Sequence, residues 1–212
     1  MVKQERAART RRALINAAAE AFADDGYALA SLPAISKRAG VSTGALHFHF
    51  SSKDALAAAV ESAAEHTVRT MAEQCGASTV TPLQCLVSAV TRLLDAVSTD
   101  PVTRAGLRLA GDPSRKSGGG LIRWWHEWVR DVLVAAAEAG ELPRTVSPEG
   151  AAMAISAAVA GVGLLGGAFG PEPLAQVHLA QFREFLLSRL AVSPWSEQPG
   201  RLDGAAESVE SG

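Results

Sequence analysis

The sequence has little of what marks membrane, secreted or β-sheet proteins. The stretch that comes closest to a membrane span, residues 151–170, is uncharged but rich in alanine and glycine, so we expect a buried helix of a soluble protein there. The basic N-terminus is not followed by the apolar segment of a secretory signal. The two cysteines, Cys75 and Cys85, lie in helical patterns, which favours reduced, packed thiols of a cytoplasmic protein over a redox pair.

Runs of β-branched residues that alternate with polar ones are also missing, and helical periodicity takes their place along most of the chain. Pro82 and Pro101 stand where first helical turns are expected, and a missing N–H is tolerated there. We therefore predict an all-α fold with about nine helices. The expected helices cover residues 10–22, 31–39, 54–74, 82–97, 101–110, 121–139, 148–169 and 173–190, and a further one contains residues 47–50.

Charge is divided unevenly along the chain. Residues 1–60 contain eight Lys or Arg and five Asp or Glu, a balance of +3, whereas the whole chain carries −2, so the remainder carries −5. A basic first quarter on an acidic remainder indicates an end that binds a polyanion, although a randomly uneven surface gives the same count. We predict a small domain at residues 1–52, a larger domain at 53–191 and a disordered acidic tail at 192–212.

Residues 47–50, His-Phe-His-Phe, allow three interpretations: a strand, a metal site or one face of a helix. A lone strand in an all-α protein has no partner for its backbone groups. Histidines two apart on a helix diverge by roughly 200°, so we expect no metal ion between them. On a helix, Leu46 and Phe50 form an inward i, i+4 pair, and residues 47–49 face outward.

A helix-turn-helix in residues 1–52 is predicted by the helix at 31–39, the tight Ala39-Gly40-Val41 turn and the helix through residues 47–50. Such a unit lays its second helix in the major groove of DNA. Small residues let the backbone approach the duplex, and hydroxyl, imidazole and ammonium groups donate to phosphates or base edges. A helical hairpin without a DNA partner is the alternative. The expected DNA-binding residues are Ser42, Thr43, Gly44, Ala45, His47, Phe48, His49 and Lys53.

A resemblance to a known family is carried by residues 10–56, TRRALINAAAEAFADDGYALASLPAISKRAGVSTGALHFHFSSKDAL, which are similar to the DNA-binding region of the TetR family of repressors. It implies a homodimer that represses transcription at a palindromic double-stranded operator and responds to a small-molecule ligand, with no enzymatic activity and no cofactor. His47 stands where the family usually has a tyrosine that touches the DNA backbone, and an imidazole there is expected to make the contact sensitive to pH. The matching positions are Gly26-Tyr27, Ile35, Ala39-Gly40-Val41, Gly44, Phe50, Lys53 and Leu56.

A narrower resemblance is carried by residues 100–110, DPVTRAGLRLA, and by a tryptophan in the helix that follows. Both are similar to the γ-butyrolactone receptors and pseudo-receptors that control antibiotic synthesis in filamentous bacteria. In that group an indole from this helix lines the ligand pocket, and Trp125 matches it best, with a merely packed indole as the alternative. Ala64 and Val162 stand where we expect receptors to offer a Gln and a Thr. A buried ligand carbonyl without a donor costs roughly 1–3 kcal/mol, which favours a pseudo-receptor-like pocket for a mostly apolar ligand or antibiotic over a true butyrolactone receptor.

Residues 161–167, GVGLLGG, contain the spacing G-x-G-x-x-G. A dinucleotide site needs a strand before these glycines, and none is expected, so we interpret them as small residues that let two helices approach closely. The TetR resemblance places this helix in a four-helix bundle with the partner subunit, which puts Gly161, Gly163, Gly166 and Gly167 in or near a dimer interface. More distant alternatives are a ligand-independent DNA binder and an enzyme, and no nucleophile motif or metal cluster in the sequence supports the latter.

Overall fold

The computed structural model describes residues 2–76, 81–115 and 119–165, and the separate positions 181, 184 and 188. Within these residues it contains eight α-helices and no strand, which confirms the all-α prediction. The predicted helix at 173–190 and the tail at 192–212 lie outside the continuously described ranges. None of the described helices is long and apolar enough to cross a membrane. The helices are α1 Val2–Leu29, α2 Leu32–Arg38, α3 Thr43–His49, α4 Lys53–Gly76, α5 Pro82–Thr99, α6 Pro101–Ala110, α7 Gly120–Glu138 and α8 Pro148–Leu165.

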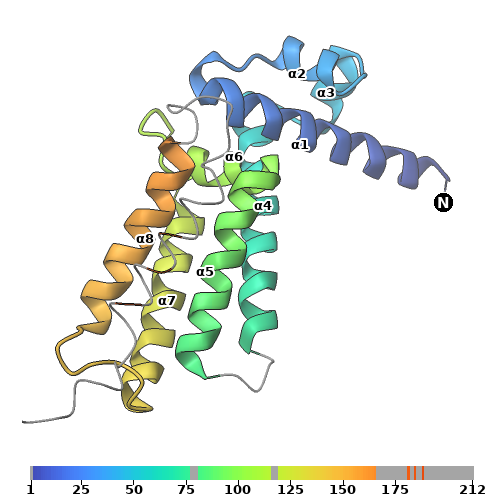
Figure 1. Ribbon diagram of the computed structural model, residues 1–212. Coiled ribbons are helices and arrows are strands. Elements are labelled where there is room, and N and C mark those ends of the chain that lie inside the picture. The colour runs from blue at the N-terminus through green and yellow to red at the C-terminus, as the bar shows by residue number, and fades with distance from the viewer. Residues whose placement is uncertain are drawn as a thin grey trace, which may run out of the picture.

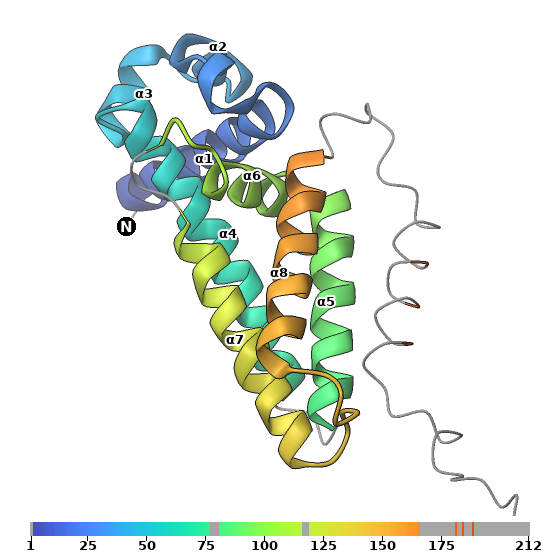
Figure 2. The same ribbon diagram turned by 90° about the vertical axis from the view of Figure 1, so that its left-hand side faces the viewer.

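The helices form two units that meet at one end of a bundle (Figure 1). We name α1–α3 the head, and the four long helices α4, α5, α7 and α8 the body. The head lies across the end of the body at which α4 begins and α8 ends, and the short helix α6 runs between the two units (Figure 2). The head is therefore held by the first turns of α4 and by α6.

The core of the head is built from apolar side chains at helical spacing. Leu14 and Phe22 of α1 are fully buried and belong to one cluster with Ile35 of α2 and Leu46 of α3. In α1, Leu14, Ala18 and Phe22 recur at steps of four, so one face of this helix is apolar. Leu56 at the start of α4 completes the cluster and links the head to the body.

Helix α1 is longer than the sequence pattern predicts. It begins at Val2 instead of residue 10, and it continues to Leu29 through a kink at Gly26, where φ is 78°. Residues 2–9 have no apolar face for periodicity to detect, but most of them are good helix formers. The helix predicted to end at residue 22 thus continues to a kink at Gly26, which glycine accommodates because it populates positive φ without a steric penalty.

Helix α6 contributes to two cores at once. Ala105 and Leu109 belong to the core of the head, whereas Leu107, on the opposite side of the helix, belongs to the core of the body. A Cβ on Gly106 would overlap the Cβ of Ala64, so α6 and α4 cross in direct contact. Tight packing on both sides means that α6 cannot shift without disturbing both units.

Candidate nucleic-acid interface and its junction with the body

The turn between α2 and α3 is fixed by side-chain caps. Ser31 accepts a hydrogen bond from the N–H of Ala34 at the start of α2, and Ser42 accepts one from Ala45 at the start of α3. The hydroxyls of Ser36 and Thr43 lie 3.3 Å apart and join the two helices directly. These contacts satisfy N–H groups that a helix start leaves unpaired, and they hold α3 at a defined angle to α2.

Helix α3 has the inward and outward faces that the sequence predicts. Leu46 exposes none of its surface and Phe50 only 4%, so both side chains point into the head. His47 is exposed, His49 is half-buried, and Phe48 exposes 82% of its surface. A phenyl ring held this far in solvent forgoes the free energy of burial.

The small residues at the start of α3 leave its backbone accessible. Ser42 and Gly44 are exposed, Ala45 is half-buried, and a Cβ on Gly44 would meet nothing closer than the Ser42 hydroxyl at 3.9 Å. Thr43 is exposed as well, although its hydroxyl also contacts Ser36. The start of α3 is thus open enough for a duplex to approach.

Lys53 is placed differently from the other predicted DNA-binding residues. Its ammonium donates to the carbonyl of Ala28 at 3.1 Å and lies 4.6 Å from the centre of the Tyr27 ring. Burial lowers the pKa of Lys53, and the nearby Asp112 carboxylate partly offsets this effect. Here Lys53 stabilises the end of α1, and its side chain has to rotate before it can reach a phosphate, so that contact stays a prediction.

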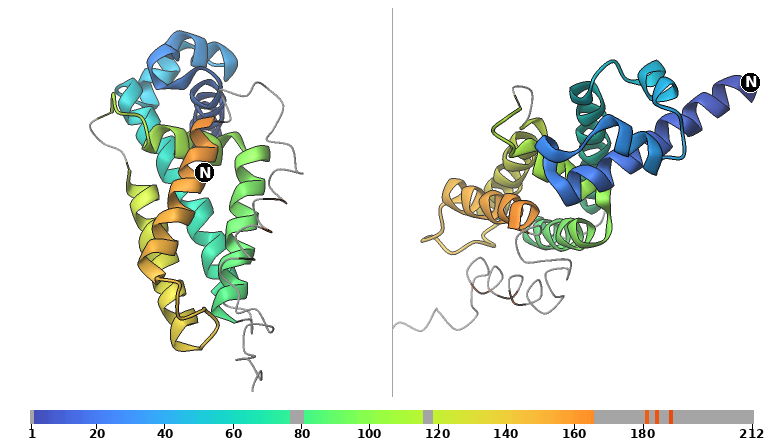
Figure 3. Two further views of the ribbon diagram at one scale, coloured as in Figure 1. Left: turned by 60° about the vertical axis from the view of Figure 1, so that its left-hand side comes forward. Right: turned by 90° about the horizontal axis from the view of Figure 1, so that it is seen from above.

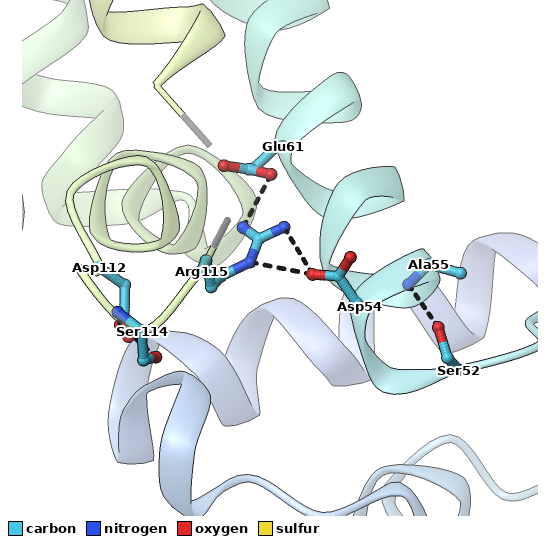
Figure 4. Close-up of polar contacts among 7 residues, drawn as sticks. All are labelled: Ser52, Asp54, Ala55, Glu61, Asp112, Ser114 and Arg115. Atoms are coloured by element: carbon cyan, nitrogen blue, oxygen red, sulfur yellow. Dashed lines mark hydrogen bonds and ion pairs between the residues drawn. The ribbon is translucent and has the colours of Figure 1, made fainter. Parts of the chain in front are cut away.

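A buried arginine joins the α6–α7 loop to α4. The side chain of Arg115 exposes no surface, with Nη1 2.7 Å from Oε2 of Glu61 and Nη2 3.4 Å from Oδ1 of Asp54 (Figure 4). Nε and Nη2 both donate to Oδ1 of Asp54 at 3.4 Å, and Nη1 forms the shorter ion pair with Glu61. The guanidinium also lies 5.3 Å from the centre of the Tyr27 ring. Burial raises the pKa of Glu61, and Arg115 partly offsets that rise.

A second arginine, Arg108 of α6, donates hydrogen bonds to the end of the straight part of α1. Its Nη1 donates to the carbonyls of Ala23 and Asp24 at 2.6 and 3.2 Å, which are left without helical partners by the kink at Gly26. A Cβ on Gly26 would lie 3.0 Å from Arg108 Nη2, so a glycine there also makes room for the guanidinium. Sequence reasoning missed both arginines, because their partners lie between 54 and 85 residues away along the chain and the segment around Arg115 reads as a flexible break.

The three residues predicted to bind a ligand belong to the same region of the body. Trp125 exposes 2% of its surface and Ala64 none, and Val162 packs against the cluster that contains both. The indole N–H of Trp125 is buried and has no hydrogen-bond partner in the described part of the chain. The ring stacks on Trp128, with ring centres 5.3 Å apart. A buried donor without an acceptor is costly, so the ligand contact of Trp125 stays a prediction that this N–H makes testable.

The glycines of α8 fall in different surroundings. A Cβ on Gly163 would lie 2.8 Å from the Cβ of Leu107, so Gly163 lets α8 approach α6 within this chain. Gly161 is half-buried, with no atom within 4 Å of an added Cβ, whereas Gly166 and Gly167 lie outside the described residues. A role for these glycines in a dimer interface remains a prediction.

Comparisons with known proteins agree with this geometry. Residues 14–60, from the buried part of α1 to the second turn of α4, match the family model described as bacterial regulatory proteins, tetR family. The chain is 32% identical over 213 residues to the A-factor receptor protein of Streptomyces griseus, which covers 99% of this chain and 75% of that protein.

Two solved structures have a similar fold. One is a γ-butyrolactone receptor described as ArpA-like, which is 28% identical with a TM-score of 0.76, covering 90% of this chain and 92% of that one. The other is CprB from Streptomyces coelicolor in complex with its operator sequence, which is 28% identical with a TM-score of 0.77, covering 88% of this chain and 90% of that one. The likeness therefore extends over head and body together.

Proposed function

Because the chain belongs to the TetR family of bacterial regulatory proteins, we propose that it is a homodimeric repressor whose α3 helices bind adjacent major grooves of a palindromic operator and that a small molecule releases it. The observation that carries the proposal is the outward face of α3. Phe48 exposes 82% of its surface between two histidines, while Leu46 and Phe50 anchor the helix in the head. This face combines apolar contact area with donors on a rigid support.

The chemistry of α3 suits the major groove. Phe48 can contact a thymine methyl group, and the imidazoles of His47 and His49 can donate to phosphates or to base acceptors. The bare backbone at Gly44 allows close approach. In a dimer, the two helices meet adjacent half-sites when they stand about 34–36 Å apart, so any change in their spacing weakens binding.

The ligand that we propose is mostly apolar, with one acceptor oxygen. Trp125 supplies a flat surface and an N–H that no described residue accepts, whereas Ala64 and Val162 add no hydrogen-bonding side chain. An antibiotic or antibiotic intermediate, as for a pseudo-receptor, fits these side chains best. A γ-butyrolactone is the second candidate, and the 32% identity to the A-factor receptor protein favours it. Both classes carry an oxygen that can accept from Trp125.

Ligand and operator binding are coupled in this proposal through α6 and the loop that follows it. A ligand beside Trp125 displaces α7, and the loop before α7 carries Arg115, which is paired with Glu61 and Asp54 on α4. Arg108 transmits the same movement to the end of α1. The ligand then favours the arrangement in which the two heads are spread, so operator affinity falls by a shift of population.

Binding assays with the full-length protein test the proposal. A palindromic duplex selected from a random pool is expected to bind far more tightly than a scrambled duplex, and Phe48→Ala is expected to remove most of this difference. A thermal-shift screen of γ-butyrolactones and antibiotics then identifies a ligand that also releases the operator in gel shifts. Trp125→Ala should abolish the release and leave operator binding intact. Induction that survives in Trp125→Ala would show that the ligand site is elsewhere.

A further inference from the structure

The first three turns of α1 form a helix that packs on nothing in the body. We name residues 2–13 the N-terminal arm. The arm precedes residues 14–60, which match the family model, and Leu14 is the first buried side chain of α1. In Figure 1 the arm projects past α3 and away from α8, and the view from above in Figure 3 shows the same direction. An apolar core therefore does not explain why this segment is helical.

The charges of the arm also work against a free helix. Lys3, Arg6, Arg9 and Arg12 follow each other at steps of three, so neighbouring cations lie close together on the helix and repel one another. Cations near a helix N-terminus are further disfavoured by the helix dipole, and Glu5 in the first turn, the one carboxylate of the arm, offsets only part of this effect. Arg6, Arg9 and Arg12 are exposed, and among the described residues no carboxylate forms an ion pair with them. A dense array of negative charge beside the arm would remove both penalties.

Arg11 fixes how the arm sits relative to α3. Its guanidinium lies 5.3 Å from the centre of the Phe50 ring, and Phe50 is the residue that ends α3. The base of the arm is thus attached to the C-terminal end of the helix that reads the operator. When α3 lies in the major groove, the arm is carried along with it in a set direction and does not swing freely.

We propose that the N-terminal arm is a second DNA-binding surface, which binds backbone phosphates outside the base pairs that α3 contacts. The inference rests on the DNA-binding function proposed for α3. The arm points away from α8, where we expect the partner subunit, so in a dimer the two arms point toward the outer flanks of the operator. From Arg6 to Arg12 the helix rises about 9 Å, over which a duplex presents about five phosphate charges. Contacts of this kind add affinity and no sequence preference.

The salt dependence of binding measures these contacts directly. In the triple variant Arg6→Gln, Arg9→Gln, Arg12→Gln, helix propensity is retained while the positive charges are removed. Each phosphate contact contributes about 0.9 to the slope of log K against log salt, so the six arginines of a dimer account for a decrease of about 5. Affinity at 0.1 M salt is expected to fall by at least about tenfold, and by the same factor on operator and scrambled duplexes.

The matched control is a variant that loses the same three positive charges from the body instead of the arm. The variant Arg123→Gln, Arg130→Gln, Arg144→Gln alters three exposed or half-buried arginines of α7 and the loop after it, and we expect its slope to stay at the wild-type value. A trimmed operator duplex that ends at the outer edges of the half-sites should bind wild type and arm variant equally. A duplex with long flanks should restore the difference.

Two results would overturn the inference. One is a salt slope of the arm variant equal to that of wild type on the long duplex, with melting curves confirming that both are folded. The other is a difference between them that persists on the trimmed duplex. The first result can also be obtained without operator recognition by α3. If wild type does not distinguish operator from scrambled DNA, the proposed function fails, while the salt slope on long scrambled DNA still tests the arm.

Discussion

Replacing Arg115 by methionine tests whether the buried ion pairs hold the junction between loop and α4. The guanidinium exposes no surface, and its Nη1 lies 2.7 Å from Glu61. Removing one partner of a buried pair costs about 3–5 kcal/mol, because the other charge is left without compensation. Here the side chains of Glu61 and Asp54 are 16% and 53% exposed, so water compensates part of the loss. We expect Arg115→Met to lower the free energy of unfolding by about 2–4 kcal/mol.

For a chain of this size, that loss lowers Tm by roughly 5–15 °C. Circular dichroism during thermal and urea unfolding measures both quantities. Arg69→Met is the matched control, since it makes the same chemical change on α4 itself. There the guanidinium is 42% exposed, pairs with Glu65 one turn away and lies 4.4 Å from the centre of the Trp124 ring, an exposed cation–π contact worth about 0.5–1 kcal/mol. A surface pair of this kind contributes less than about 1 kcal/mol.

A double variant identifies the partner. Arg115→Met combined with Glu61→Leu removes both charges, and exchanging a whole buried pair for apolar side chains is often close to neutral. We therefore expect the double variant to regain most of the lost stability. The reasoning is refuted if Arg115→Met melts like wild type, or if the losses of the two single variants simply add in the double variant.

Three further predictions concern the junction and the ligand site. In Arg115→Met the pKa of Glu61 rises further above its ordinary value of 4.5, because the compensating guanidinium is gone. A raised carboxyl pKa stabilises the fold below the unfolded pKa, and this contribution is lost as pH rises through the folded pKa. Urea unfolding should therefore find the free energy of unfolding of the variant closer to that of wild type at pH 5 than at pH 8. Gly106→Ala forces α6 away from Ala64 and should lower the free energy of unfolding by roughly 1–3 kcal/mol, as measured by thermal melting. Its control is Gly150→Ala, whose Cβ would lie 3.7 Å from Ser147 and which should change the free energy of unfolding by less than about 1 kcal/mol. Trp125→Phe keeps a ring and removes the N–H, so calorimetry with a carbonyl ligand from the thermal-shift screen should show affinity reduced by about twofold to tenfold; unchanged affinity would mean that the N–H does not bind the ligand.

Local spacing was sufficient to predict the elements that depend on it. The i, i+4 pair Leu46 and Phe50 determines which side of α3 faces inward, so the exposure of Phe48 followed from the sequence alone. The first helical turns at Pro82 and Pro101 were also predicted, because proline restricts where a helix can start. These are short-range effects, which a sequence displays directly.

Contacts between distant segments could not be predicted in this way. Arg115 lies in a stretch whose composition indicates only a loop, and its partners Asp54 and Glu61 look like ordinary surface residues of an alanine-rich helix. The lack of an acceptor for the Trp125 N–H likewise depends on every neighbour of the ring. The arm is a different case. The three-residue spacing of its cations is visible in the sequence, but the helical state of residues 2–9 and the position of the arm beside α3 required the structure.

Helix α6 contributes to both cores, and this affects whether the head can be produced as a separate fragment. A fragment that ends at residue 52 would lack Leu56, Ala105 and Leu109, which belong to the same core as Leu14 and Phe22. The side chains of Leu14 and Phe22 would then be exposed to water. The fragment is thus expected to be unfolded or aggregated when produced alone. We therefore expect the head to depend on α4 and α6 for its stability.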